Sequence, residues 1–414
     1  MNFSHAPKRG ILPHFKNWSD AFVFQGFSFE HQFISRLPLP AFMIIAIHIK
    51  PVESGLDEAY LSYLILLFYK MAQSQPAHQF IFIHDRAYEG FSARPDNVKH
   101  VILLPQSDVP LLRKYWLDVK LPFLLKKLRA DVLVSASGVA SLTTKVPQLL
   151  FVKDLGFLHQ PAQYSKPRNR SLKKSYLGYT GKAKQIFCFT AFHKEDVKRQ
   201  FGVHEEKVQV LPMVPLEDFH TYTEEDLSFI KENYTDGREY FLYTGPIHER
   251  LNLVNLLKAF SLFKKRQRSS WKLVLEGSYQ DQAFMQLLET YKYKDDVIVL
   301  RATEEERWKL IRAAYALVFP AKWEGFILPV VEALACKIPV LAPAESAAQE
   351  VGKEAAFYFD ADNPEDMADK LMFLYKDENS RRQLIDQSLG VVQHYKTADP
   401  VDQVWAAIIN TATT

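Results

Sequence analysis

Short apolar runs alternate along the chain with stretches of helical periodicity from residue 42 onward. A short apolar run bounded by turn-forming residues is typical of a strand buried on both faces, and the longer periodic stretches are typical of crossover helices. In the first half of the chain the runs predict strands at residues 42–49, 79–83, 100–104, 131–135, 148–152, 185–189 and 207–211. Helical stretches lie between them, notably at 57–72 and 111–128. The alternation predicts an α/β protein with a parallel sheet.

A second series of the same kind predicts strands at residues 239–244, 271–276, 297–300, 314–319, 340–342 and 356–359. An acidic stretch without a strand signal, near residues 215–235, separates the two series and is interpreted as the interdomain connection. We therefore predict one domain at 41–217 and a second at 236–390, followed by a tail at 391–414 with a helix at 401–411. Residues 1–40 precede the first strand and receive no role.

Two glutamates, Glu324 and Glu332, lie eight residues apart around a predicted strand-to-helix turn. The run at 315–319 predicts a buried strand and 328–336 predicts a helix, whose first turn tolerates Pro329 because the missing N–H would be unpaired there. Backbone N–H groups and the helix dipole in such a turn face an anion, typically a phosphate. Eight helical residues rise roughly 12 Å, and a separation of that order between the two carboxylates suits the two ends of a nucleotide sugar. Carboxylates accept hydrogen bonds from the hydroxyls found there. The alternative is a pair of solvated glutamates.

The stretch 319–336 resembles the E-x7-E signature of the family-four retaining glycosyltransferases, whose usual form is close to E-G-F-G-L-P-x-x-E-A-x-A-x-G-x-P-V. The resemblance extends over most of the chain from about Ala41. It implies the GT-B fold, in which two Rossmann-like domains face each other across a cleft and the C-terminal one holds the donor nucleotide. A last helix would cross back to the first domain; the alternative for it is a core helix of the second domain. The resemblance further implies that Glu324 contacts the transferred sugar and Glu332 the ribose.

The resemblance also implies an activity and its partners. A hexose would move from a nucleotide-diphosphate sugar to a hydroxyl of a glycan or lipid-linked acceptor, with retention at the anomeric carbon. The helix mouth formed by Gly325, Phe326 and Ile327 would hold the diphosphate or the sugar by its backbone N–H groups. Neither a bound cofactor nor a metal is expected, and the sequence has no metal-ligand spacing of His, Cys or carboxylates.

The segment after the first strand of the second domain departs from the family pattern. The usual form is close to G-T-x-x-x-R-K-N-L, whereas this chain has Gly245-Pro-Ile-His-Glu-Arg-Leu-Asn-Leu. Gly245, Arg250 and Asn252 occupy matching places, but Leu251 stands where the family has the lysine that neutralises the diphosphate. Pro246 stands at the place of an optional arginine. Charge stabilisation of this kind is commonly worth several kcal/mol, so a replacement cation is needed, and the candidates are Arg250, His248 and Lys322.

Further departures affect the acceptor side and the signature itself. The loop after the first strand has a single glycine, Gly55, where the family has a Gly-rich loop, and an ordinary turn is the alternative. Lys153-Asp154-Leu155 replaces the usual His-Asp-Leu, and Lys153 is either functional or merely solvated. Ile327 replaces a glycine and is expected to narrow the space beside the sugar. Lys337 replaces the glycine that usually ends the helix.

Composition adds a few limits. The chain has 414 residues, 48% of them hydrophobic, which is enough for two cored domains, and its net charge of +3 argues against a nucleic-acid-binding protein. Two cysteines suggest no disulfide framework and fit a reducing compartment. No apolar run is long enough to span a bilayer and residues 1–40 lack a signal-peptide pattern, so a cytoplasmic protein is expected.

Two basic stretches with aromatic residues, 111–129 and 164–184, suggest contact with the inner face of a membrane or with a phosphorylated acceptor. For each of them an ordinary helix, packed on the core or solvated, is the alternative. The departures at Lys153 and Leu251 also leave a rival function open: a catalytically impaired GT-B protein that binds nucleotide or glycan or serves as an assembly subunit. A sugar-nucleotide epimerase of the same fold is a third possibility. A cation directed at the helix mouth would favour the enzyme.

Overall fold

The computed structural model describes residues 42–50, 58–86, 94–215, 222–278, 281–396 and 399–413. The N-terminal 40 residues and Gly55 lie outside these ranges, so the prediction for Gly55 stays a prediction. The described residues form two parallel sheets, and we call the parts of the chain that carry them the N-terminal and the C-terminal domain.

The sheet of the N-terminal domain has seven strands in the order β3-β2-β1-β4-β5-β6-β7, all paired in parallel. Along β1, Ile45 and Ile47 enter one hydrophobic cluster and Ala46 enters another, so both faces of the sheet are covered. This double burial explains the uninterrupted apolar runs in the sequence. The strands are β1 Ile44–His48, β2 Gln79–His84, β3 Val98–Ile102, β4 Val132–Ser135, β5 Gln148–Phe151, β6 Gln185–Cys188 and β7 Val208–Val210.

The sheet of the C-terminal domain has six strands in the order β10-β9-β8-β11-β12-β13, again all parallel. In both sheets the order reverses beside the first strand of the domain, as in doubly wound folds. The strands are β8 Tyr240–Thr244, β9 Lys272–Glu276, β10 Val297–Leu300, β11 Ala316–Val318, β12 Val340–Pro343 and β13 Ala356–Phe359.

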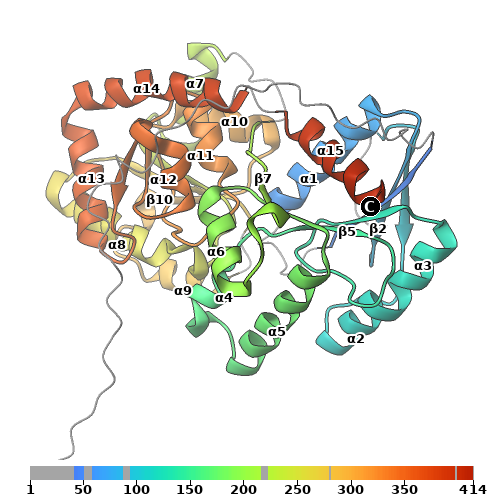
Figure 1. Ribbon diagram of the computed structural model, residues 1–414. Coiled ribbons are helices and arrows are strands. Elements are labelled where there is room, and N and C mark those ends of the chain that lie inside the picture. The colour runs from blue at the N-terminus through green and yellow to red at the C-terminus, as the bar shows by residue number, and fades with distance from the viewer. Residues whose placement is uncertain are drawn as a thin grey trace, which may run out of the picture. The chain divides into compact units, whose positions relative to one another are not determined.

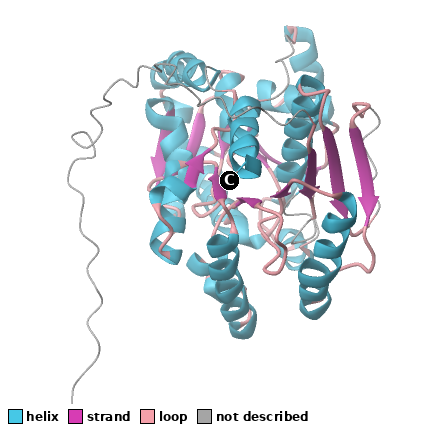
Figure 2. Ribbon diagram, turned by 45° about the vertical axis from the view of Figure 1, so that its right-hand side comes forward, coloured by secondary structure: helices cyan, strands magenta, loops and turns pink. Residues whose placement is uncertain are grey.

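Helices cover both faces of each sheet (Figures 1 and 2). The helices that follow the strands of the N-terminal domain are α1 Glu58–Ser74, α2 Pro110–Tyr115, α3 Leu121–Leu128, α4 Gly156–His159, α5 Lys166–Lys182, α6 Ala191–Phe201 and α7 Glu224–Thr235. Those of the C-terminal domain and tail are α8 Leu253–Gln267, α9 Gln282–Glu289, α10 Glu304–Ala313, α11 Leu328–Ala335, α12 Ala347–Gly352, α13 Pro364–Lys376, α14 Glu378–Lys396 and α15 Pro400–Thr413. No helix within the described ranges combines the length and the apolar character that crossing a membrane requires.

The last helix, α15, confirms the predicted return to the first domain. It contacts α1, β4 and β5, and in Figure 1 its red ribbon lies beside blue α1. Its Trp405 ring lies 4.9 Å from the His78 ring and 6.4 Å from the Phe80 ring, both in the N-terminal domain. The alternative of a core helix of the second domain is therefore wrong.

Every predicted strand is present, with ends shifted by a few residues, but one other expectation needs correction. The single helix predicted at 111–128 is divided into α2, a π-helical turn at Trp116–Lys120, and α3. Pro122 accounts for the wide turn, because its ring lacks an N–H and would clash with the carbonyl four residues earlier in a regular α-helix. The connection predicted near 215–235 has no strand in its described residues. It contains α7, which begins with a capping box of Thr223 and Asp226.

Candidate functional site

Both signature glutamates are buried, so the alternative of a solvated pair is wrong. Glu324 lies between β11 and α11 with 8% of its surface exposed, and Glu332 lies within α11 with 2% exposed. A buried carboxylate needs charged or hydrogen-bonding partners. Each glutamate has them, but from different parts of the chain.

Glu324 lies in a cluster of charges contributed by both domains. Lys153 Nζ donates to Glu324 Oε1 at 3.0 Å, and Arg250 Nη2 lies 3.6 Å from Glu324 Oε2. The same Arg250 nitrogen lies 3.8 Å from Asp154 Oδ2. Lys153 and Asp154 follow β5 of the N-terminal domain, whereas Arg250 and Glu324 belong to the C-terminal domain. Two cations and two carboxylates thus meet at the junction of the domains.

The charges in this cluster tune one another. Burial raises the pKa of Glu324, against the opposing effect of Lys153, and Asp154 raises it further. Burial also acts to raise the pKa of Asp154, but Arg250 and Lys153 overcome it, so this carboxyl stays ionised. Glu324 and Asp154 balance the charges of Arg250 and Lys153 in this structure. The same two cations are placed where they could pair with a negatively charged ligand.

Glu332 is paired within its own domain. Arg307 on α10 grips the carboxylate with both terminal nitrogens: Nη1 bonds Oε2 and Nη2 donates to Oε1 at 2.8 Å. Glu276, at the end of β9, lies near the same pair; burial raises its pKa to about 7, and Glu332 contributes to the rise. Sequence reasoning missed Arg307 and Glu276, since neither stands at a spacing that links it to Glu332.

The three residues of the helix mouth pack against the N-terminal domain and the hydrophobic core. A Cβ on Gly325 would lie 1.7 Å from the carbonyl oxygen of Lys153, so glycine is required because the two backbones approach closely. The Phe326 ring packs edge-on against Tyr60 and Phe189 of the N-terminal domain, with centroids 5.5 and 6.1 Å away. Ile327 is fully buried. Its side chain therefore points into the core, and the expectation that it narrows the space beside the sugar stays a prediction.

In the loop after β8, two neighbouring residues have different surroundings, one in the hydrophobic core and one in the charged cluster. Leu251 is buried in the hydrophobic core, while the neighbouring Arg250 side chain reaches Glu324. Arg250 Nη1 also donates to the hydroxyl of Tyr164 at 2.8 Å, a contact that sequence reasoning missed. Gly245 (φ 138°) lies against Gly277, where a Cβ would come within 1.9 Å of the Gly245 carbonyl oxygen.

The other predicted donor-site residues have contacts of their own. Asn252 donates its amide hydrogens to the carbonyls of Pro320 and Ala361, at 3.1 and 2.8 Å. His248 Nδ1 accepts from the Arg250 backbone N–H at 3.1 Å. Lys322 Nζ lies 3.7 Å from Glu345. Among the three cations proposed to replace the family lysine, Arg250 is therefore the one that the structure directs at Glu324.

A buried histidine completes the junction. His193, at the start of α6, has its Nδ1 2.9 Å from the Thr190 hydroxyl, and its ring edge would lie 3.2 Å from a Cβ at Gly325. Burial lowers the pKa of His193, so the imidazole is neutral near pH 7. No spacing in the sequence marked this residue.

Comparisons with known proteins agree with the geometry. Residues 224–389 match the family described as "Glycosyl transferases group 1". The O-antigen chain mannosyltransferase B of Escherichia coli is 25% identical over 232 residues, which is 55% of this chain and 61% of that protein. The O-antigen chain mannosyltransferase RfbU of Salmonella typhimurium is 26% identical over 188 residues, 45% of this chain and 48% of that protein. The chain thus spans between about half and three fifths of these two relatives.

Solved structures show the same fold at low identity. WaaG, a glycosyltransferase involved in lipopolysaccharide biosynthesis, superimposes with a TM-score of 0.71 at 16% identity, covering 88% of this chain and 98% of WaaG. Anabaena HepE in complex with UDP and glucose gives 0.68 at 14% identity, covering 89% and 99%. The chain therefore has the GT-B fold, and its residues 224–389 match the family of group 1 glycosyl transferases.

Proposed function

We propose that this protein is a retaining glycosyltransferase that moves a hexose from a nucleotide-diphosphate sugar to a hydroxyl of a glycan or lipid-linked acceptor. The observation that carries the proposal is the Arg250 guanidinium, 3.6 Å from Glu324 at the mouth of α11. It supplies the positive charge that Leu251 lacks at the lysine position of the family. The names of the relatives make mannose the first sugar to test.

The residues divide the work by position. Arg250 and Lys153 stabilise the diphosphate as it departs, because negative charge grows on it in the transition state. Glu324 accepts hydrogen bonds from sugar hydroxyls, and Glu332, oriented by Arg307, accepts them from the ribose. Asp154, ionised between Arg250 and Lys153, lies on the acceptor side. No step in this scheme calls for a bound metal or cofactor.

Calorimetric titration with UDP, GDP and ADP, alone and as sugar conjugates, tests the donor site. We expect micromolar binding of one nucleotide, followed by sugar transfer from its conjugate. Arg250→Gln should lower kcat about 100-fold, whereas Arg382→Gln should leave it unchanged, since the Arg382 side chain on α14 is exposed. Binding without transfer under any condition would favour the non-catalytic binder, and no binding at all would overturn the proposal.

The acceptor side offers a surface for peripheral contact with a membrane, which accords with a cytoplasmic location. We call this surface the α2–α3 face. One side of the segment packs on the core, as the alternative interpretation required, but the other side is exposed, with Leu111 at 79% and Phe123 at 72%. Basic residues flank these apolar side chains, and such a surface suits anionic lipid head groups. The basic residues are Arg113, Lys114, Lys120, Lys126, Lys127 and Arg129.

Sedimentation with vesicles tests this contact. The double variant Leu111→Ser/Phe123→Ser should lose binding to vesicles that contain phosphatidylglycerol. Phe229→Ser is the matched control, since Phe229 is 64% exposed but lies on α7. Equal binding by all three proteins would contradict a role of the α2–α3 face.

A further inference from the structure

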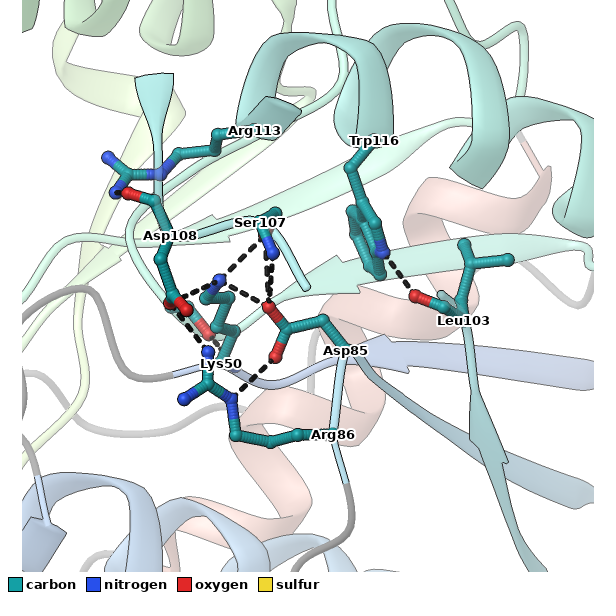
Figure 3. Close-up of polar contacts among 9 residues, drawn as sticks. Lys50, Asp85, Arg86, Leu103, Ser107, Asp108, Arg113 and Trp116 are labelled. Carbon is teal, nitrogen blue, oxygen red and sulfur yellow. Dashed lines mark hydrogen bonds and ion pairs between the residues drawn. The ribbon is translucent and has the colours of Figure 1, made fainter. Parts of the chain in front are cut away.

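A second polar cluster lies at the carboxyl edge of the N-terminal sheet, apart from the glutamate site (Figure 3). Its members come from the segments that follow β1, β2 and β3 and from the start of α2. The proposed transfer reaction uses none of them. The charged members are Lys50, Asp85, Arg86, Asp108 and Arg113.

The cluster occupies the place where a doubly wound sheet binds ligands. The strand order reverses between β1 and β4, and Lys50 and Ser137 stand two residues beyond these strands. The Lys50 backbone N–H donates to the Ser137 hydroxyl and joins the two strand ends. Ligands bind in such a crevice, outside the carboxyl ends of the strands. The end of β5, which carries Lys153, is two strands away, or about 10 Å along the edge.

One carboxylate of the cluster is fully committed to the protein. Asp85 is buried and accepts from Lys50 Nζ, from the Ser107 backbone N–H at 2.8 Å and from Arg86 Nε at 3.1 Å. Although burial opposes its ionisation, the hydrogen bonds from Lys50 and Ser107 hold the pKa of Asp85 well below its usual range. Asp85 therefore balances Lys50 and shares in the balance of Arg86, and the three cations of the cluster outnumber its two carboxylates.

The other carboxylate lies at the surface, where the remaining cations converge. Asp108, with a side chain 62% exposed, has its Oδ1 2.5 Å from Arg86 Nη2 and 3.4 Å from Lys50 Nζ. Arg113 Nη2 donates to the Asp108 backbone carbonyl at 3.2 Å. Figure 3 shows the three basic side chains directed at this residue. An exposed carboxylate held by cations can be displaced by a stronger anion.

A narrow pocket beside the cluster contains a polar group without a partner. His48 lines it together with Lys50, Ser107, Arg113 and Trp116. The imidazole is fully buried, and neither of its ring nitrogens has a hydrogen-bond partner among the described residues. Burial lowers the pKa of His48 to about 3, so the ring is neutral and offers one N–H donor. Buried donors without partners are rare and costly. The pocket has room for no more than about one water molecule, so a phosphate can lie only at its mouth.

We propose that the mouth of this pocket binds a phosphate group of the acceptor, with Arg86 and Arg113 pairing its oxygens. Asp108 holds the place of the phosphate in the free protein. Paired guanidinium groups suit a phosphate because they offer several donors in a planar fork and match its double charge. Only the assignment of this phosphate to the acceptor rests on the proposed function.

Calorimetric titration of the full chain with inorganic phosphate and pyrophosphate tests the subsite. The arginine variants and the aspartate variant should change the affinity for phosphate in opposite directions. Arg113→Gln and Arg86→Gln should each weaken binding about ten-fold, as for loss of a charge-assisted hydrogen bond. Asp108→Asn should tighten binding several-fold, because the competing carboxylate is gone. A purely structural cluster would not yield changes of opposite sign. Absence of phosphate binding in both the wild type and Asp108→Asn would overturn the proposal.

Arg250→Gln separates this subsite from the donor site. Phosphate binding that survives in Arg250→Gln but falls in Arg113→Gln belongs to the pocket, whereas loss in Arg250→Gln alone would overturn the assignment. Nucleotide titrations run in parallel judge the proposed function independently: a chain that binds phosphate at Arg113 but no nucleotide would keep the subsite and lose the transferase.

Two further ligands distinguish the sources of the phosphate. Glucose 1-phosphate represents a soluble sugar phosphate, and phosphatidylcholine vesicles containing phosphatidic acid represent a lipid. Arg129→Gln is the matched control, since Arg129 is exposed on the same basic segment but outside the pocket. Arg113→Gln should weaken the binding of one of these two ligands more than Arg129→Gln does. The ligand affected identifies the source of the phosphate, a soluble sugar phosphate or a lipid. Equal effects of the two variants on both ligands would contradict a specific pocket.

Discussion

Glu324 and Glu332 are both buried in the C-terminal domain, yet their charges are balanced in different ways. Arg307, which pairs with Glu332, comes from α10 of the same domain and forms two hydrogen bonds with it. Glu324 shares Lys153 and Arg250 with Asp154, and two of these partners belong to the N-terminal domain. The ribose end of the proposed donor site is therefore preformed within one domain, whereas the sugar end exists only when the two domains are in contact.

This difference gives binding and chemistry separate structural requirements. In the proposed donor site, a nucleotide would meet Glu332 and Arg307 already paired within one domain. In the proposed reaction, the transferred sugar would meet Lys153 and Glu324 together only where the two domains are in contact, so turnover would depend on that contact. The following predictions test this division, beginning with the largest effect.

Removal of the interdomain carboxylate should affect turnover most. Glu324→Ala should lower kcat by about 100- to 1,000-fold. The sugar hydroxyls lose the carboxylate that accepts their hydrogen bonds, and Lys153 and Arg250 lose their ion-pair partner. Affinity for the nucleoside diphosphate should change little, since Glu332 and Arg307 remain. Steady-state kinetics and calorimetry measure the two effects, with Glu345→Gln as an exposed control. A Glu324→Ala variant that lost nucleotide affinity and kept kcat would reverse the comparison.

Breaking the preformed pair should affect stability. Arg307→Met leaves the Glu332 carboxylate buried without its cation and should lower the free energy of unfolding by about 3 kcal/mol. The double variant Arg307→Met/Glu332→Leu should recover most of this loss, because no buried charge is left. Urea denaturation followed by circular dichroism provides the measurement. A double variant no more stable than Arg307→Met would show that the charge is not the cause.

The third prediction concerns the pH dependence of the preformed side. The pKa of Glu276 is about 7 in the folded protein, against an ordinary value of 4.5, so the folded state binds more protons than the unfolded state between these limits. Its contribution to stability must therefore fall as the pH rises from about 4.5 to about 7 and stay constant above. Relative to wild type, Glu276→Gln should gain roughly 3 kcal/mol between pH 4.5 and pH 8. Urea denaturation at several pH values tests this, and exposed Glu305→Gln should show no such gain.

The smallest effect on stability is expected for Lys153. Lys153→Met removes one of two cations from Glu324 but leaves Arg250 in place, so the unfolding free energy should fall by about 1 kcal/mol. The contrast with Arg307→Met sharpens the comparison, since the shared cluster tolerates the loss of one partner better than the isolated pair does. The same denaturation experiment decides; a loss as large as that in Arg307→Met would contradict the shared charge balance.

The α/β architecture could be predicted because strands buried on both faces leave short apolar runs, which alternate here with longer stretches of helical periodicity. The E-x7-E spacing located Glu324 and Glu332, and the missing lysine at Leu251 pointed to Arg250 as a substitute. Arg307 could not be predicted, because its pairing with Glu332 depends on how α10 packs beside α11. For the same reason His193 and Tyr164 escaped notice. The burial of Ile327 could not be predicted either, because the sequence does not say to which side of the turn its side chain points.

Gly325 has a mechanical consequence for this division of labour. At this position the main chain of one domain rests on the main chain of the other, with the Lys153 carbonyl where a β-carbon would stand. Even one methyl group at 325 would act as a wedge and force the domains apart by more than an ångström. The absence of a side chain at Gly325 thus sets the distance between the two domains at this point. It determines how closely Lys153 and Glu324 can approach each other before any substrate binds.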